Sequence, residues 1–154
     1  MLSAGSAAPD VLLHLHNGTS TLISDLQSRQ NVVLYFYPKD FTWGCTRQAC
    51  SFAGHYQDIV SQRAVLIGIS ADSAESHRRF AERHQLPFLL GSDPDLAIAR
   101  AYDILDFGFR RLRVTYVIDL QGIIRGVVHH EVIVENHWKS VMKILQELEQ
   151  QVTS

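Results

Sequence analysis

Short apolar runs alternate with amphipathic segments along most of the chain. Residues 31–37 (NVVLYFY) form a continuous apolar run rich in β-branched and aromatic side chains, and residues 64–70 (AVLIGIS) form a second apolar run. Such runs are typical of strands that are buried on both faces of a sheet. Pro38 ends the first run, because proline has no N–H group to donate to a neighbouring strand. We therefore predict that residues 31–37 form a central strand.

Other segments carry weaker strand patterns. Strands are predicted at residues 11–16, 87–90, 114–119 and 123–128. The turn dipeptide Asn17-Gly18 follows the first of these and indicates an early hairpin. Gly122 lies in the short link between the last two, which indicates an antiparallel hairpin.

Helices are predicted between the strands. Apolar residues at spacings of three and four, among them Ala49, Phe52 and Ile59, predict a helix over residues 44–62. Further helices are predicted at residues 74–85, at residues 94–102 and from about residue 136 onward. The alternation indicates an α/β domain with parallel strand pairs early and antiparallel pairs late. This mixed central sheet flanked by helices resembles a thioredoxin-like fold, although periodicity alone does not separate it from other small α/β folds.

Composition and charge exclude several classes of protein. The chain has 154 residues, of which 46% are hydrophobic and 19% charged, as in ordinary globular domains. We expect a single domain over residues 1–154. With 14 basic and 16 acidic side chains the net charge is −2. This balance argues against nucleic-acid binding, because neutralising phosphates requires a basic surface.

The hydropathy pattern gives no reason to expect a membrane protein. No apolar stretch approaches the roughly 18 residues of a membrane-spanning helix. The first ten residues (MLSAGSAAPD) have neither the basic region nor the apolar run of a signal peptide. We expect a cytoplasmic location, or an organelle stroma if a transit peptide has been removed.

The segment from Tyr37 to Cys50 (YPKDFTWGCTRQAC) carries the candidate chemistry. A chain of this length buries enough surface to be stable without disulfides, so its two cysteines are free for chemistry. Cys45 is predicted where the loop after a central strand enters a helix, and unpaired amides there favour a thiolate over a thiol. Pro38 fixes the exit from the strand, and the Thr42 hydroxyl can hydrogen-bond a group at the sulfur.

The second cysteine, Cys50, follows Cys45 by five positions. In an ideal helix the Cα atoms of such a pair are about 8 to 9 Å apart and lie on different faces, whereas a disulfide requires less than about 7 Å. A bond between them therefore requires that the helix unwinds locally. The spacing excludes a CxxC centre of the thioredoxin type. A zinc site would need histidines to complete its ligands, and inert packing is the remaining alternative.

This segment resembles the active-site motif of the peroxiredoxins, in which Pro, three residues, Thr or Ser and two residues precede a cysteine. A second cysteine five positions on is the hallmark of the Q-type, or bacterioferritin comigratory protein, subgroup. Further matches in family order lie at residues 7–10 (AAPD), 65–73 (VLIGISADS) and 113–124 (RVTYVIDLQGII). The resemblance covers nearly the whole chain and implies a thioredoxin-like fold.

The resemblance also implies a role for each matching residue. Cys45 would be the peroxidatic cysteine, with Pro38 and Thr42 as its pocket partners. Arg113 would be the arginine beside the sulfur, and Cys50 would be the resolving cysteine. A permanently charged guanidinium near Cys45 would stabilise the thiolate and hold the oxygen atoms of a peroxide.

The implied activity is that of a thiol-dependent peroxidase. The Cys45 thiolate would attack hydrogen peroxide or a small organic hydroperoxide, and the resulting sulfenic acid would condense with Cys50 to a disulfide. Thioredoxin or a glutaredoxin-like protein would reduce that disulfide. The resemblance implies no metal, haem or flavin cofactor, and it favours a monomer.

Two positions depart from the subgroup pattern. Trp43 stands where proline is frequent, and Phe41 stands where a polar residue is frequent. The pair could form an apolar entrance that favours organic hydroperoxides, or a docking surface for the electron donor. Alternatively, Trp43 simply packs on its loop.

Other interpretations remain at the level of the sequence. A redox sensor with this fold would retain the cysteines without peroxide turnover, and a protein thiol-disulfide oxidoreductase would lack the expected CxxC motif. A metal site at His129, His130 and His137 is disfavoured, because adjacent strand residues face opposite sides of a sheet.

Overall fold

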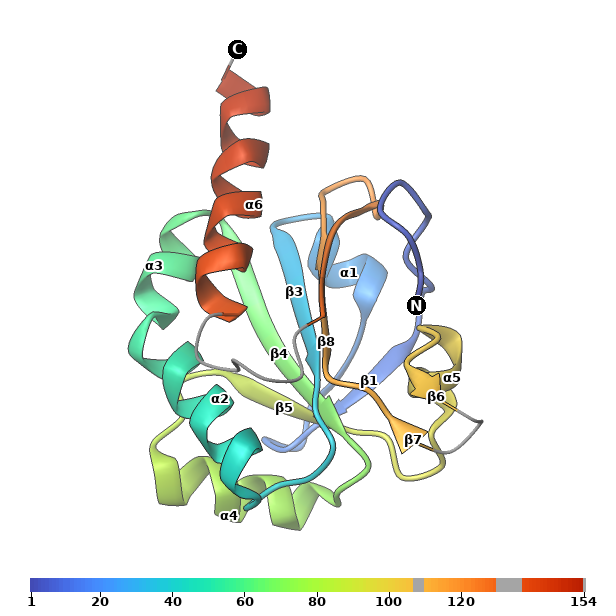
Figure 1. Ribbon diagram of the computed structural model, residues 1–154, viewed down its shortest axis with the longest axis vertical. Coiled ribbons are helices and arrows are strands. Elements are labelled where there is room, and N and C mark those ends of the chain that lie inside the picture. Colours follow the sequence, from blue (N-terminus) through green and yellow to red (C-terminus); the bar gives the residue numbers. More distant parts are fainter. Residues whose placement is uncertain (107–109, 130–136, 154) are drawn as a thin grey trace.

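The computed structural model describes residues 1–106, 110–129 and 137–153 (Figure 1). The strands are β1 (Leu12–Leu15), β2 (Ser20–Leu22), β3 (Asn31–Phe36), β4 (Ala64–Ser70), β5 (Leu89–Ser92), β6 (Leu105–Asp106), β7 (Arg110–Arg111), β8 (Val114–Ile118) and β9 (Ile124–His129). The helices are α1 (Ile23–Gln27), α2 (Trp43–Gly54), α3 (Tyr56–Ser61), α4 (Ala74–His84), α5 (Ala97–Ala101) and α6 (His137–Thr153).

Seven strands form one mixed sheet in the order β2-β1-β5-β4-β3-β8-β9. The pairs β3/β4 and β4/β5 are parallel, whereas β8 runs antiparallel to both β3 and β9. The short strands β6 and β7 pair separately with each other. Among the described residues, no helix is long and apolar enough to span a membrane.

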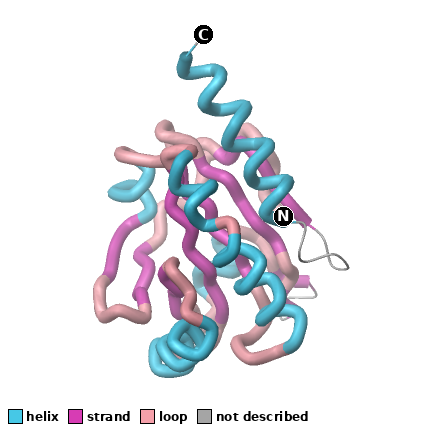
Figure 2. The backbone as a smooth tube through the Cα atoms, turned by 90° about the vertical axis from the view of Figure 1, so that its left-hand side faces the viewer, coloured by secondary structure: helices cyan, strands magenta, loops and turns pink. Residues whose placement is uncertain are grey.

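The central strand β3 is buried on both faces, and its side chains alternate between two hydrophobic clusters. Val33 and Tyr35 pack under α2, α3, α4 and α6, whereas Val32, Leu34 and Phe36 belong to the cluster on the α1 and α5 side. In Figure 2, helices of the first group lie in front of the strands. The continuous apolar run is therefore explained by two buried faces.

Most predicted elements are confirmed. The apolar run at 64–70 is β4 without any shift in its bounds, and the hairpin at 114–128 is β8 and β9. The thioredoxin-like mixed sheet is also confirmed, with its parallel pairs at the centre. The strand predicted at 87–90 begins two residues later, as β5.

The helix predicted over residues 44–62 is wrong as one element, because it breaks at His55 into α2 and α3. Gly54 immediately precedes the break, and glycine is a poor helix former. The ring of His55 stacks on Trp138 of α6 with centroids 3.4 Å apart. A tertiary contact therefore stabilises the break, and periodicity does not report it.

The helix predicted at 94–102 is shorter than expected and begins at Ala97. The Asp93 carboxylate accepts hydrogen bonds from the amides of Ile98 and Ala99, at 2.9 Å each. This cap, rather than Pro94, fixes the start of α5. The early hairpin indicated by Asn17-Gly18 is confirmed as β1 and β2. The short elements α1, β6 and β7 were not predicted, because two to five residues carry too little periodic signal.

Candidate active site

The sheet topology brings two segments that are distant in sequence together at one end of the neighbouring strands β3 and β8. Strands β3 and β8 are antiparallel, with Phe36 opposite Val114. The loop that leaves β3 for α2 therefore lies beside the residue that enters β8, which is Arg113. Cys45 follows this loop as the third residue of α2. The 68-residue separation between Cys45 and Arg113 is closed by strand pairing.

Cys45 and Arg113 are in direct contact. The Arg113 Nη2 group donates to the Cys45 Sγ atom at 3.3 Å, and both side chains are buried, with exposures of 9% and 2% respectively. Among the described residues no carboxylate forms an ion pair with Arg113. The guanidinium is thus placed directly against the Cys45 sulfur, where a positive charge would stabilise a thiolate.

The second guanidinium nitrogen of Arg113 is held by Gln48, which the sequence reasoning missed. Arg113 Nη1 donates to Gln48 Oε1 at 2.5 Å. The Gln48 amide nitrogen in turn lies 3.2 Å from His137 Nδ1, and the Thr115 hydroxyl lies 3.3 Å from the same nitrogen. All four side chains are buried. This hydrogen-bonded chain fixes the direction of the guanidinium towards Cys45.

Gln48 lies one helical turn after Cys45 and faces the same side of α2. Only that i, i+3 spacing could have marked it in the sequence. His137 was considered there as a metal ligand, but its Nδ1 faces Gln48 and Thr115. His129 lies at the exposed end of β9, and His130 lies outside the described residues.

Pro38 and Thr42 border the loop that leads to Cys45. Thr42 is the N-cap residue of α2 and has extended backbone angles, but its hydroxyl does not cap the helix. The hydroxyl donates instead to the Lys39 carbonyl at 3.0 Å. The oxygen keeps its lone pairs for a donor at the sulfur. No hydrogen bond joins Thr42 to Cys45 within the described part of the chain, so its contact with the reaction stays a prediction.

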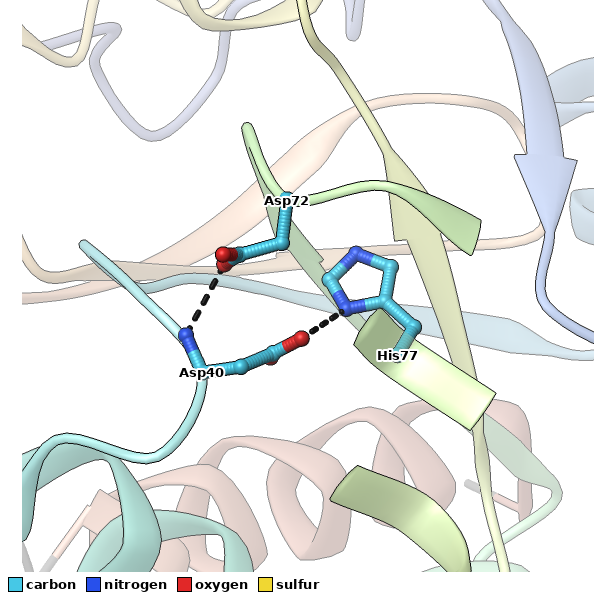
Figure 3. Close-up of side chains that lie close together, drawn as sticks. All are labelled: Asp40, Asp72 and His77. Atoms are coloured by element: carbon cyan, nitrogen blue, oxygen red, sulfur yellow. Dashed lines mark hydrogen bonds and ion pairs between the residues drawn. The ribbon is translucent and has the colours of Figure 1, made fainter. Parts of the chain in front are cut away.

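A largely buried polar cluster of Asp40, Asp72 and His77 holds the loop between β3 and α2 in place (Figure 3). The Asp40 carboxylate lies 2.8 Å from His77 Nδ1 and also accepts from the Tyr37 hydroxyl at 2.6 Å. The Asp40 amide donates to Asp72 at 2.8 Å, and His77 Nε2 faces the Gly91 carbonyl at 3.0 Å. These contacts already occupy both His77 nitrogens. The cluster therefore serves as a tie between the loop, α4 and β5.

Cys50 lies on the same helix in a different environment. It is exposed, and both cysteines are unpaired. Partial burial raises the pKa of the Cys50 thiol. Because α2 is continuous from Trp43 to Gly54, helix geometry puts the Cys45 and Cys50 Cα atoms about 8 to 9 Å apart. A disulfide between them requires α2 to unwind.

The two aromatic residues beside the site point outward. Trp43 is 74% exposed, and the Arg47 guanidinium lies over its ring at 4.5 Å. Phe41 is 52% exposed and contacts Phe80 edge to face, with ring centroids 5.2 Å apart. Trp43 thus stacks with an arginine of its own helix. The interpretation that Trp43 simply packs on its loop does not fit this exposed position.

Comparisons with known proteins show the family of the chain. Residues 4–127 match the AhpC/TSA family. The chain is 38% identical over 149 residues to "Peroxiredoxin Q, chloroplastic" from Oryza sativa subsp. japonica, covering 96% of this chain and 68% of that protein. It is 40% identical over 128 residues to "Peroxiredoxin Bcp" of Bacillus subtilis, covering 79% and 81% of the two chains.

Solved structures show the same fold. Peroxidoxin BcpB from Mycobacterium tuberculosis has a TM-score of 0.89 at 29% identity, covering 96% of this chain and 98% of that chain. The bacterioferritin comigratory protein of Xanthomonas campestris, whose structures concern alkyl peroxide reduction, has a TM-score of 0.83 at 29% identity, covering 96% and 97%. The chain therefore belongs to the AhpC/TSA family and is a thiol-dependent peroxidase of the peroxiredoxin Q or Bcp type.

Proposed function

We propose that Cys45 is the peroxidatic cysteine of this enzyme. The single observation that carries the proposal is the buried contact between Cys45 Sγ and Arg113 Nη2. The Cys45 thiolate attacks one peroxide oxygen, the O–O bond breaks, and the distal oxygen leaves as water or an alcohol after protonation. Arg113 faces the atoms on which negative charge develops and stabilises that charge. Cys45 becomes a sulfenic acid.

Pro38 and Thr42 shape the pocket in this proposal. Pro38 directs the chain out of β3. The Thr42 hydroxyl oxygen accepts a hydrogen bond from the peroxide, while its O–H group donates to the Lys39 carbonyl. The Asp40 cluster supports both by holding the loop against α4. Gln48 acts through Arg113 as a positioning residue.

Cys50 is the resolving cysteine in the second step. Its sulfur attacks the Cys45 sulfenic acid, an S–S bond forms, the S–O bond breaks, and water leaves. The reaction needs the first turns of α2 to unwind, because Cys45 is buried and Cys50 is exposed on the same helix. Turnover is therefore coupled to local unfolding at the N-terminal half of α2.

The remaining assignments follow the family. Peroxiredoxins act on peroxides with thioredoxin-type reductants, and for this chain we propose thioredoxin or a glutaredoxin-like protein. The substrates are hydrogen peroxide and small alkyl hydroperoxides, in keeping with the alkyl peroxide reduction reported for the Xanthomonas relative. We propose that residues 1–154 act as one domain, without a metal or organic cofactor, and as a monomer. The compartment is the cytoplasm or, as for the chloroplastic relatives, a stroma.

Trapping the intermediates tests this proposal. The reduced protein is mixed with one equivalent of hydrogen peroxide in the presence of a sulfenic-acid reagent such as dimedone, and the products are mapped by mass spectrometry. We expect the adduct on Cys45, and a Cys45–Cys50 disulfide when the reagent is omitted. An adduct confined to Cys50 would reverse the two roles.

The two alternatives, a redox sensor and a protein thiol-disulfide oxidoreductase, have their own tests. Sustained peroxide consumption with thioredoxin and its reductase is expected for the peroxidase and not for a sensor. Insulin reduction by this chain is expected to stay at background, since the helix carries no CxxC motif.

A further inference from the structure

His84 contacts the sulfur of the proposed resolving cysteine. The His84 Nδ1 atom lies 3.9 Å from Cys50 Sγ, within the range of a hydrogen bond to sulfur. Cys50 belongs to α2 and His84 is the last residue of α4, so the contact joins two helices. The His84 ring is half-buried and packs edge-on against the buried Phe80, with centroids 5.1 Å apart. Phe80 thus holds the imidazole in place.

Cys50 needs a base if it is to act as a nucleophile near neutral pH. The thiolate, not the thiol, attacks a sulfur electrophile. Burial raises the pKa of Cys50, and no charged neighbour among the described residues offsets that effect. The Cys45 sulfur lies against the Arg113 guanidinium, whereas the Cys50 sulfur has the His84 imidazole within hydrogen-bonding distance. Left alone, Cys50 would be almost entirely in the unreactive thiol form at neutral pH.

We propose that His84 is a catalytic residue of the resolving step, acting as the general base for Cys50. The inference rests on the resolving role proposed above. In the Nε2–H tautomer, His84 Nδ1 is an acceptor and takes the proton from Cys50 Sγ. The imidazolium that results lies in the last turn of α4, where the helix carbonyls stabilise a positive charge. The thiolate is also better hydrated than the thiol, which favours its release as α2 unwinds.

The Cys50 thiolate forms a bond to the Cys45 sulfur, the S–O bond breaks, and the hydroxide takes the proton from the imidazolium, directly or through water. The sulfenic sulfur of Cys45 is reduced and the Cys50 sulfur is oxidised. One sulfenic acid and one thiol yield one disulfide and one water, and His84 returns to its neutral form. His84 has no part in the first oxidation, because its contact is with Cys50 alone among the two sulfurs.

The experiment is two-phase stopped-flow on the wild type, His84→Ala and His84→Gln. Formation of the sulfenic acid and of the disulfide are followed separately by Trp fluorescence and by acid-quench mass spectrometry. At pH 7 we expect an unchanged first phase and a second phase about 100-fold slower, which is the lower end of the usual contribution of a general base. Added imidazole is expected to restore part of the rate in His84→Ala.

The pH profile separates proton transfer from a merely structural role. Cys50 ionises without help at alkaline pH, so the deficit of both variants is expected to shrink steadily between pH 7 and about pH 9.5. Arg83→Gln is the matched control, because Arg83 is exposed on the same turn of α4. Its second phase is expected to match that of the wild type.

Two outcomes would overturn the inference. An equal second phase in the wild type and both His84 variants would show that Cys50 ionises without His84. A faster second phase would show that the contact only restrains α2 from unwinding. Failure of the resolving role itself looks different, because the wild type would then form no Cys45–Cys50 disulfide at all.

Discussion

The two cysteines of helix α2 show how far one residue type can be differentiated within two helical turns. Cys45 is buried at the start of the helix, with a guanidinium 3.3 Å from its sulfur. Cys50 is exposed, and its contact is an imidazole nitrogen at 3.9 Å. A guanidinium carries a fixed positive charge, whereas an imidazole can accept and return a proton.

The difference suits the chemistry proposed for each sulfur. The first step creates negative charge on a leaving oxygen, so a fixed positive charge in a buried pocket is the suitable partner. The second step consumes a thiol and releases water, so a group that accepts and returns a proton is suitable. In the proposed cycle a fixed charge thus assists Cys45, and a proton-accepting imidazole assists Cys50. Substitutions at four residues test this division of roles.

The largest expected effect is that of Cys45→Ser. Serine retains the size of the side chain but lacks the nucleophilic thiolate, so peroxide consumption should fall to background, a loss of at least about 10³-fold. Peroxide loss is measured with a colorimetric assay under thioredoxin turnover. Retained turnover would mean that the reacting sulfur is elsewhere.

Cys50→Ser should separate the two steps. The second-order oxidation of Cys45 should remain within about twofold of the wild type, because Arg113 and Gln48 are untouched. Turnover with thioredoxin should fall by at least about tenfold, since no intramolecular disulfide forms. Mass spectrometry of the oxidised variant should show a lasting sulfenic acid. Undiminished thioredoxin turnover would contradict the resolving role of Cys50.

Arg113→Ala removes the fixed charge. We expect the oxidation rate of Cys45 to fall about 10²- to 10³-fold, the usual cost of losing one donor to a developing oxyanion. Arg113→Lys should recover only part of this rate, because a lysine cannot donate to both Cys45 and Gln48 in the same fork geometry. Stopped-flow mixing of reduced protein with peroxide gives both rates. Equal rates for wild type and alanine variant would remove Arg113 from the site.

Gln48→Ala should have the smallest effect of the four. The guanidinium keeps its charge but loses its orienting acceptor, and one hydrogen bond to a charged group contributes about 1.5 to 3 kcal/mol. We expect the oxidation rate to fall about tenfold while the disulfide-forming phase is unchanged. Gln57→Ala, at an exposed position on α3, is the control. A loss confined to the second phase would move Gln48 out of the Cys45 pocket.

Local sequence patterns predicted the elements that carry Cys45, but they did not predict the contact between Cys45 and Arg113. The apolar runs located β3 and β4, and the loop-to-helix position of Cys45 followed from Pro38 and the helix pattern after it. Arg113 was found only through the family motif. Its contact depends on antiparallel pairing between β3 and β8, and no local pattern encodes that pairing.

Local sequence patterns do not predict the partners of the two sulfurs either, because most of these contacts join different elements. Gln48 offers only an i, i+3 spacing from Cys45, while His137 and His84 reach the site from α6 and α4. The break at His55 is similar, because stacking on Trp138 of another helix stabilises it. Local periodicity predicts elements, and contacts between elements complete the site.

The most direct test of the account is the second-order rate constant of fully reduced protein with hydrogen peroxide, followed by stopped-flow fluorescence. Trp43 is two residues from Cys45 and exposed, so its emission should report the oxidation of that sulfur. The account predicts a rate several orders of magnitude above that of a free thiol, lost in Cys45→Ser and retained in Cys50→Ser. A rate equal to that of free cysteine would contradict an activated thiolate at Cys45.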